Sequence, residues 1–179
     1  MNFLLKSEQK TFIESLIKSL QKFDDNYWFD CDSKGLFPYE FFTQMAKGGW
    51  LGITFPSIYG GSGLGITEAA LMMIEIAKKG GMTAASSIHM NIFSPSSIIK
   101  YGNKEQCKNW LPDIVKGQTK VCFAVTEPDS GLDTRNLKTF ALKKNGHYVI
   151  NGKKIWTSAA QISDKIMILA RTSKNQTKN

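Results

Sequence analysis

The sequence of 179 residues contains no uninterrupted run of about 18 apolar residues, so it predicts no membrane-spanning helix. Its beginning also lacks the apolar core and small-residue cleavage site of a secretory signal peptide, and we therefore expect no secretion. The three cysteines, Cys31, Cys107 and Cys122, lie far apart, form no Cys-x-x-Cys motif and cannot all pair in disulfides. Free thiols of this kind are typical of a reducing compartment, so a cytoplasmic location is expected.

Metal ligands and basic tracts are missing as well. His89 and His147 have no potential ligands at metal-binding spacing, so no metal site is predicted. The aspartates within residues 24–32 lack the spacing and the closing glutamate of a calcium-binding loop, and a solvated loop is expected there. The net charge of +8 comes from scattered lysines, which argues against nucleic-acid binding. A lysine-coated surface explains it, and a mildly positive field would also attract a phosphate-bearing ligand.

The first two thirds of the sequence show helical periodicity. A hydrophobic content of 42% and a charged content of 21% fit a globular protein with one medium or two small domains. The predicted helices cover residues 8–23, 38–47, 67–79, 83–101 with a break at Pro95, and 103–117 with a separate last turn from Pro112. The glycines of residues 60–65 do not fit the phosphate-binding pattern Gly-x-Gly-x-x-Gly, so a structural turn is predicted there.

The period changes near residue 119. Short β-prone segments then cover residues 120–126, 137–143, 147–150, 153–157 and 166–171. The pairs Asn145-Gly146 and Asn151-Gly152 are hairpin signals, which predicts that residues 147–150 and 153–156 are adjacent antiparallel strands. The sequence thus predicts an α+β fold, with an all-helical domain over residues 1–118 and an incomplete antiparallel β-domain over residues 119–179. A meander of about five strands leaves an open edge, so we expect further strands of this sheet that this sequence does not contain.

Two segments of the second part carry the chemistry. Residues 123–133, with the sequence FAVTEPDSGLD, form a β-prone run that Pro128 ends. The loop that follows is rich in Gly, Asp and Ser, which expose backbone N–H groups and suit an anionic ligand. Residues 152–158, with the sequence GKKIWTS, carry an aromatic ring followed by two hydroxyls. Together the two segments suit a flat apolar ring system with a polar edge.

These segments resemble two motifs of acyl-CoA dehydrogenases, [Phe/Tyr]-Ala-x-Thr-Glu-Pro-x-x-Gly-Ser-Asp and Asn-Gly-x-Lys-x-Trp-x-[Thr/Ser]. Residues 49–64, with the sequence GWLGITFPSIYGGSGL, are similar to the family's Gly-x-x-Gly…Pro-x-x-Tyr-Gly-Gly-x-Gly segment. The resemblance covers nearly the whole chain. It implies the family's N-terminal helical domain and part of its middle β-domain, whereas the rest of that domain and a C-terminal four-helix domain lie outside this sequence.

The resemblance implies an FAD-dependent oxidoreductase of fatty-acid or branched-chain metabolism, which converts an acyl-CoA thioester to the 2-enoyl-CoA. It implies that Thr126 contacts the polar edge of the flavin near N5 and O4 and that Trp156 packs against the ring. The residues that it implies for FAD binding are Phe123, Val125, Thr126, Gly131, Leu132, Trp156, Thr157 and Ser158. Leu132 is also the implied substrate contact. It stands where the family usually has Ser, so only its backbone N–H is retained.

The resemblance implies no catalytic residue in this sequence, because the family's base is usually a glutamate of the C-terminal domain. Glu127 is structural in the family, and Arg135 is either a phosphate ligand or a solvated loop residue. We therefore expect no α-proton abstraction by this chain alone and weak or absent flavin binding. For the full-length form the resemblance implies an acyl-CoA substrate, a homo-oligomer and a separate electron-transfer acceptor.

Two other interpretations remain open. The chain could belong to an acyl-CoA oxidase or a flavin monooxygenase, which share these domains with the dehydrogenases. It could also be a non-catalytic or split-enzyme module whose open β-edge pairs with a separately encoded C-terminal half.

Overall fold

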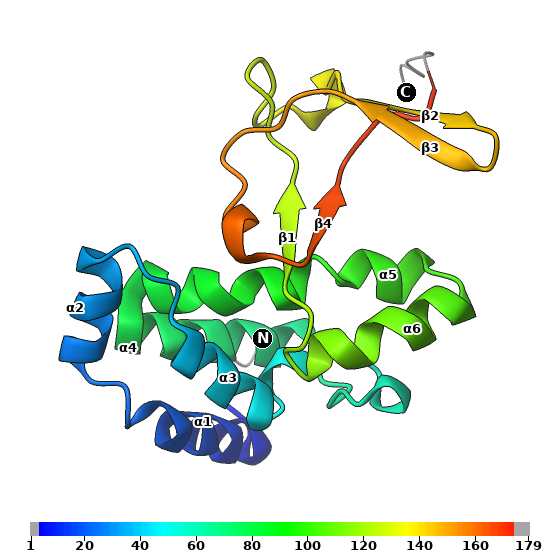
Figure 1. Cartoon of the computed structure of the whole chain (residues 1–179). Coiled ribbons are helices and arrows are strands. Elements are labelled where there is room, and N and C mark those ends of the chain that lie inside the picture. Colours follow the sequence, from blue (N-terminus) through cyan, green and yellow to red (C-terminus); the bar gives the residue numbers. More distant parts are fainter. Residues whose placement is uncertain (1–3, 174–179) are drawn as a thin grey trace. The chain divides into compact units, whose positions relative to one another are not determined.

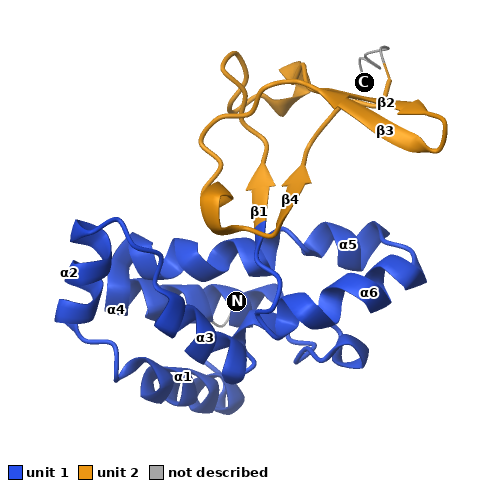
Figure 2. Ribbon diagram, viewed as in Figure 1, with its two compact units in different colours: residues 1–121 blue, residues 122–179 orange. Residues whose placement is uncertain are grey.

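The structure, a computed structural model, describes residues 4–173 of the chain. The chain divides into two compact units, residues 1–121 and residues 122–179 (Figure 2). The first unit is built of helices and the second carries the strands, so the predicted α+β fold is confirmed. Within residues 4–173 no helix is long and apolar enough to cross a membrane.

The helical unit contains a hydrophobic core of buried aromatic and aliphatic side chains. Its helices, drawn in Figure 1, are α1 (Ser7–Leu20), α2 (Asp25–Ser33), α3 (Tyr39–Lys47), α4 (Ile66–Phe93), α5 (Ser96–Tyr101) and α6 (Lys104–Val115). Helices α1, α2 and α3 all pack on α4. The predicted inner face of α3 is confirmed, since Phe41, Phe42 and Met45 are buried. Each such side chain contributes about 1.5–3 kcal/mol when it leaves water, so this core stabilises the unit.

Helix α2 replaces the solvated loop predicted over residues 24–32. The Asp24 carboxylate caps it by accepting a hydrogen bond of 2.9 Å from the Tyr27 N–H. Trp28 and Cys31 are three residues apart, so they lie on the same face of the helix, and both are buried. The prediction was wrong because this cap and the buried face outweigh the low helix propensity of aspartate.

Helix α4 changes direction at the two glycines predicted to end it (Figure 1). Gly80 leaves the helical region with φ −130° and ψ 19°, and Gly81 adopts φ 59° and ψ −149°. A positive φ favours glycine, which has no Cβ to clash. At Gly80 a Cβ would overlap the ring of Trp28 from α2. The break therefore lets α2 pack closely on α4.

The two prolines near the end of the helical unit behave differently. Pro95 separates α4 from α5 as predicted. Pro112 was predicted to open a separate turn, but α6 runs through it to Val115. A proline so near the end of a helix removes one hydrogen bond, and its carbonyl still accepts from the Lys116 N–H at 3.0 Å. The helix begins at the predicted capping box, in which Asn103 and Gln106 exchange hydrogen bonds of 2.8 and 2.9 Å.

The second unit contains two separate strand pairs. Strand β1 (Val121–Ala124) pairs with β4 (Lys165–Ile168), and β2 (Phe140–Lys144) pairs antiparallel with β3 (His147–Asn151). The hairpin predicted at Asn145-Gly146 is confirmed: both residues have positive φ, at 50° and 79°, which gives a tight two-residue turn.

The strand predicted over residues 153–157 is not formed. Asn151 ends β3, and residues 152–157 run as irregular chain without a ladder to β3. Trp156 has a left-handed φ of 57°, which a strand cannot contain. The Ile155 N–H instead donates to the Thr126 carbonyl at 2.9 Å. This contact with a distant segment wins over the local hairpin signal at Asn151-Gly152.

Candidate functional site

The two motif segments lie against each other in the second unit. The hydrogen bond from the Ile155 N–H to the Thr126 carbonyl joins their backbones. On either side of it, the Lys154 ammonium donates to the Val125 carbonyl at 2.8 Å and to the Glu127 carboxylate at 2.9 Å. Tertiary structure thus brings Val125 and Thr126 next to the segment that carries Trp156, as their proposed common role requires.

Glu127 is the buried carboxylate among the motif residues. It is 5% exposed, and its carboxylate accepts hydrogen bonds from the backbone N–H groups of Lys138 and Thr139 at 2.6 and 2.9 Å. Burial by itself would raise the pKa of Glu127, but the hydrogen bonds from Thr139, Lys138 and Lys154 outweigh burial and lower the pKa to about 2. A carboxylate held ionised by this many donors is poorly suited to exchange a proton near neutral pH.

The loop after Glu127 is a tight turn. The N–H groups of Glu127 and Ser130 each donate to the other's carbonyl, at 2.8 and 3.1 Å, around Pro128 and Asp129. The Ser130 hydroxyl then donates to the Asp133 carbonyl at 2.8 Å. This turn holds Gly131 at the surface, where a Cβ would meet nothing within 4 Å.

Apolar groups of the motif segments remain exposed to solvent. The Trp156 side chain is 85% exposed and Leu132 is fully exposed. Gly131 and Ser158 are exposed too, whereas Phe123, Val125, Thr126 and Thr157 are half-buried. The left-handed conformation of a bulky residue costs free energy, and a ring that stays in water gains none from burial to offset it. Exposed apolar surface of this kind marks binding surfaces.

Three hydroxyls of the motif segments have no partner among the described residues of the protein. Within residues 4–173 the hydroxyls of Thr126, Thr157 and Ser158 make no hydrogen bond to another protein group. These are the hydroxyls that the two motifs singled out. An exposed ring flanked by unpaired hydroxyls fits a planar ligand that has an apolar face and a polar edge.

The charged groups of the loop pair among themselves. The Arg135 guanidinium donates to the Asp133 carboxylate at 2.8 Å, and these hydrogen bonds lower the pKa of Asp133. The Lys138 ammonium donates to Asp129 at 2.7 Å. Both pairs are exposed, so each contributes little to stability. Arg135 is thus a loop residue paired with its neighbour, and residues 4–173 contain no cluster of three metal-ligating side chains.

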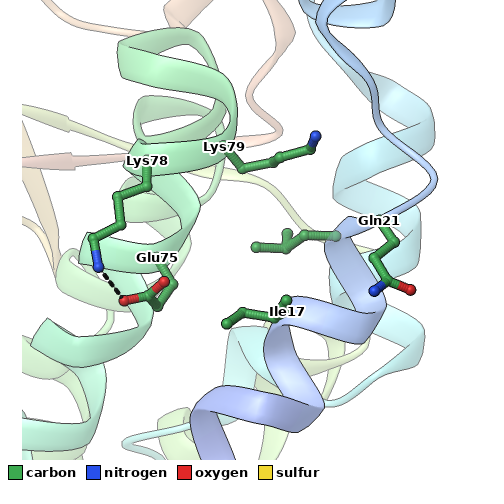
Figure 3. A pocket seen from close by; sticks show the side chains of 6 residues that line it. Ile17, Gln21, Glu75, Lys78 and Lys79 are labelled. Atoms are coloured by element: carbon green, nitrogen blue, oxygen red, sulfur yellow. Dashed lines mark hydrogen bonds and ion pairs between the residues drawn. The ribbon is translucent and has the colours of Figure 1, made fainter.

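Two other regions are accounted for without a ligand. In the loop of residues 60–65, the N–H groups of Gly61, Ser62 and Gly63 all donate to backbone carbonyls of residues 52–56, as a structural turn requires. A shallow hollow of about 320 Å³ lies between α1 and α4 (Figure 3), and its lining includes Ile17 and Gln21 on one side and Glu75, Lys78 and Lys79 on the other. The Glu75–Lys78 ion pair of 2.6 Å forms part of its rim. None of the motif residues lines this hollow.

Sequence reasoning named most residues of the region but missed one. Lys154 was not among the predicted site residues, although it is the lysine written in the motif Asn-Gly-x-Lys-x-Trp. The signal that could have identified it is the pairing of that lysine with the glutamate of Thr-Glu-Pro, since an isolated charge beside a buried strand needs a partner.

Comparisons with known proteins identify the family of the chain. Residues 6–118 match the model of the acyl-CoA dehydrogenase N-terminal domain, and residues 122–179 match that of the acyl-CoA dehydrogenase middle domain. Mitochondrial isovaleryl-CoA dehydrogenase of Bos taurus is 35% identical over 171 residues, which are 94% of this chain and 40% of that protein.

Two solved structures extend the likeness to the fold. An FAD complex of PigA has a TM-score of 0.88 at 28% identity and covers 98% of this chain and 46% of its own. A glutaryl-coenzyme A dehydrogenase in complex with glutaryl-CoA has a TM-score of 0.88 at 28% identity, over 97% of this chain and 45% of its own. The chain spans less than half the length of these relatives. With both of its parts matched, the chain belongs to the acyl-CoA dehydrogenase family, as its motifs predicted.

Proposed function

We propose that this chain supplies the helical domain, residues 1–118, and part of the middle β-domain, residues 119–179, of an FAD-dependent acyl-CoA dehydrogenase. The observation that carries the proposal is the contact between the two motif segments. The hydrogen bond from the Ile155 N–H to the Thr126 carbonyl joins the two segments. It brings the segment with the unpaired Thr126 hydroxyl next to the segment with the exposed Trp156 ring. The chain's family membership, and relatives in complex with FAD or with an acyl-CoA, support the same assignment.

The residues present fit an isoalloxazine ring. The exposed Trp156 indole would cover one face of the ring, and the half-buried Phe123 and Val125 would line its apolar side. The free hydroxyls of Thr126, Thr157 and Ser158 would serve its polar edge. When bound, FAD supplies the two-electron acceptor for dehydrogenation between the α and β carbons of the acyl group.

The loop at residues 131–132 would approach the phosphates. Gly131 and Leu132 are exposed beyond the turn that Glu127 and Ser130 close, so their backbone N–H groups are available to an anion. Leu132 would also meet the substrate, with its backbone N–H in place of the hydroxyl usual in the family. The net charge of +8 favours the approach of the coenzyme A phosphates.

No residue of this chain is proposed as the catalytic base. Glu127 stands next to the site, but its carboxylate is occupied by three donor groups and is ionised down to a pKa of about 2. It would therefore hold the loop rather than remove the α proton. For the full-length form we propose a catalytic base outside this chain and an acyl-CoA substrate. We also propose a homo-oligomer and a separate electron-transfer acceptor. A cytoplasmic location is proposed too, on the free, buried cysteines Cys31, Cys107 and Cys122.

The experiment that tests the proposal is an FAD titration of the 179-residue chain, followed by flavin absorbance and fluorescence. We expect weak, saturable binding that is lost on desalting, because this chain carries one part of the family's cofactor site. Trp156→Ala should weaken it by about fivefold to 150-fold, through the loss of about 1–3 kcal/mol of stacking. Lys153→Met, which removes an exposed neighbouring charge, should leave it within twofold. Saturable binding that Trp156→Ala does not weaken would contradict the proposal.

A second candidate is a split-enzyme or non-catalytic module, and one observation favours it. Every residue of β3 is exposed, including Tyr148, Val149 and Ile150, and Leu142 of β2 is 54% exposed. A two-stranded hairpin with apolar side chains on both faces is a surface for further strands. Coding sequence downstream decides between the two: one continuous reading frame supports the dehydrogenase, and a separate frame for a C-terminal half supports the module. An acyl-CoA oxidase or flavin monooxygenase relative would differ in its response to oxygen.

A further inference from the structure

Lys154, a mostly buried residue of the second motif segment, reaches across to the first motif segment. The Lys154 side chain is 11% exposed, and its ammonium donates to the Val125 carbonyl and the Glu127 carboxylate at 2.8 and 2.9 Å. A cationic side chain in a motif that binds a pyrophosphate cofactor is a natural phosphate ligand. Here both of its contacts are internal, and burial leaves little of it for an external anion.

We propose that Lys154 is a positioning residue, which fixes the distance between the Thr126 hydroxyl and the Trp156 ring, and that it is not a phosphate ligand. We call the Lys154 ammonium, the Val125 carbonyl and the Glu127 carboxylate the Lys154 clasp. The role of Thr126 and Trp156 in flavin binding rests on the proposed function. The clasp itself is a property of the chain.

The order of the contacts supports this role. Val125, Thr126 and Glu127 follow one another on one segment, as Lys154, Ile155 and Trp156 do on the other. The two Lys154 contacts flank the hydrogen bond from Ile155 to Thr126 on both sides. Three bonds within so few residues leave the facing backbones no freedom to slide.

The backbone conformation of Trp156 is one that its neighbours must maintain. Its φ of 57° is left-handed, which a bulky residue adopts only where its surroundings impose it. The ring itself is 85% exposed, so packing around the ring does not impose that conformation. The preceding residues do, because Ile155 and Lys154 are both bonded to the first motif segment.

Glu127 anchors the Lys154 clasp to a third segment of the chain. Its carboxylate also accepts from the N–H groups of Lys138 and Thr139, so it is anchored to the segment that leads into β2. Lys154 therefore binds to a fixed group rather than to a mobile one. Removing the lysine would leave a buried carboxylate without its counter-charge, which is strongly unfavourable.

Hydrogen exchange of the 179-residue chain tests the clasp without any ligand. We compare Lys154→Met, which keeps the aliphatic stem, with Lys154→Arg, which keeps the charge, and with the exposed control Lys153→Met. Lys154→Met should speed exchange of the Ile155, Lys138 and Thr139 amides by about tenfold to a hundredfold. Lys154→Arg should recover most of the protection, and Lys153→Met should change nothing.

The β2–β3 hairpin serves as the internal reference. Faster exchange confined to the three bonded amides supports the proposal. Unchanged protection of Ile155, or an equal loss of protection in β2 and β3, overturns it, because the first shows that the clasp holds nothing and the second shows a general effect on the unit.

Two flavin probes separate a positioning role from a phosphate ligand. Riboflavin carries the ring without phosphate, and FAD carries the pyrophosphate. If Lys154 positions the ring site, Lys154→Met weakens both by the same factor, about tenfold or more. If Lys154 binds phosphate, FAD is weakened and riboflavin is not, which overturns the proposal. If the wild-type chain binds neither flavin, the exchange experiment alone decides on the clasp.

Discussion

Asn91 is expected to stabilise the helical unit through two buried hydrogen bonds to the backbone. It lies on α4, is 3% exposed, and uses both ends of its amide. Its Nδ2 donates to the Thr119 carbonyl at 2.9 Å, and its Oδ1 accepts from the Val121 N–H at 2.8 Å. The side chain thus pairs with the chain that enters β1 as a neighbouring strand would.

The test substitution is Asn91→Leu, which keeps the number and branching of the side-chain heavy atoms and removes both hydrogen bonds. Val121 is 4% exposed, so its N–H loses its partner out of reach of water, at a cost of about 1–3 kcal/mol. Thr119 is half-buried, and water can partly replace the partner of its carbonyl. We therefore expect the free energy of unfolding to fall by about 2–4 kcal/mol in total.

Urea denaturation followed by far-UV circular dichroism measures this loss, since the helices give most of that signal. Met82→Gln is the matched control on the same helix, because Met82 is 77% exposed, and it should stay within about 0.5 kcal/mol of wild type. A change of less than about 0.5 kcal/mol for Asn91→Leu would refute the reasoning, because it would mean that the two backbone groups do not depend on Asn91.

Asn91→Asp adds a pH test of the same contact. The carboxylate keeps the acceptor for Val121 but loses the donor to Thr119 and buries a charge. Its pKa in the folded chain should therefore rise above the unfolded value. The destabilisation should be largest above that raised pKa, should decrease as pH falls from it towards the unfolded pKa, and should lose its pH-dependent part below the unfolded value, where the carboxyl is protonated in both states.

Three further predictions concern single groups. The pKa of Glu127 is lowered from 4.5 to about 2, so its ionisation should contribute about 3 kcal/mol of stability above pH 4.5. This stability should be lost as pH falls from 4.5 through about 2, and Glu127→Gln should remove the acid dependence from urea midpoints measured in that range. Gly80→Ala should destabilise by more than about 1 kcal/mol in thermal melts, because its Cβ overlaps the Trp28 ring, whereas Gly131→Ala should be near neutral. Asn145→Val should destabilise the β2–β3 hairpin by about 1–2 kcal/mol, because valine resists the φ of 50°; Asn145→Gly should not, and equal hydrogen exchange of β2 in the two variants would contradict this account.

The sequence by itself determined those features that depend on neighbouring residues. The capping box of Asn103 and Gln106, the buried face of α3, and the break at Gly80 and Gly81 follow from signals within a few residues of chain. The hairpin at Asn145-Gly146 is of the same kind, since both residues tolerate positive φ. The two family motifs are also contiguous, and so they revealed the family that the comparisons then showed.

Tertiary structure decided the features in which distant residues compete with local signals. Asn151-Gly152 resembles a hairpin turn as strongly as Asn145-Gly146 does, yet the chain after it bonds to Thr126 rather than to β3. A single sequence gives the propensity of each segment but not the partner that its backbone groups will find.

The Lys154 clasp shows the same limit at the candidate site. Lys154 and Glu127 are separated by 27 positions, and neither has a local pattern that announces an ion pair. Only when the chain folds do burial and the scarcity of internal partners force the two charges together. The motifs therefore named the groups that face a ligand, and the tertiary structure showed what holds those groups in place.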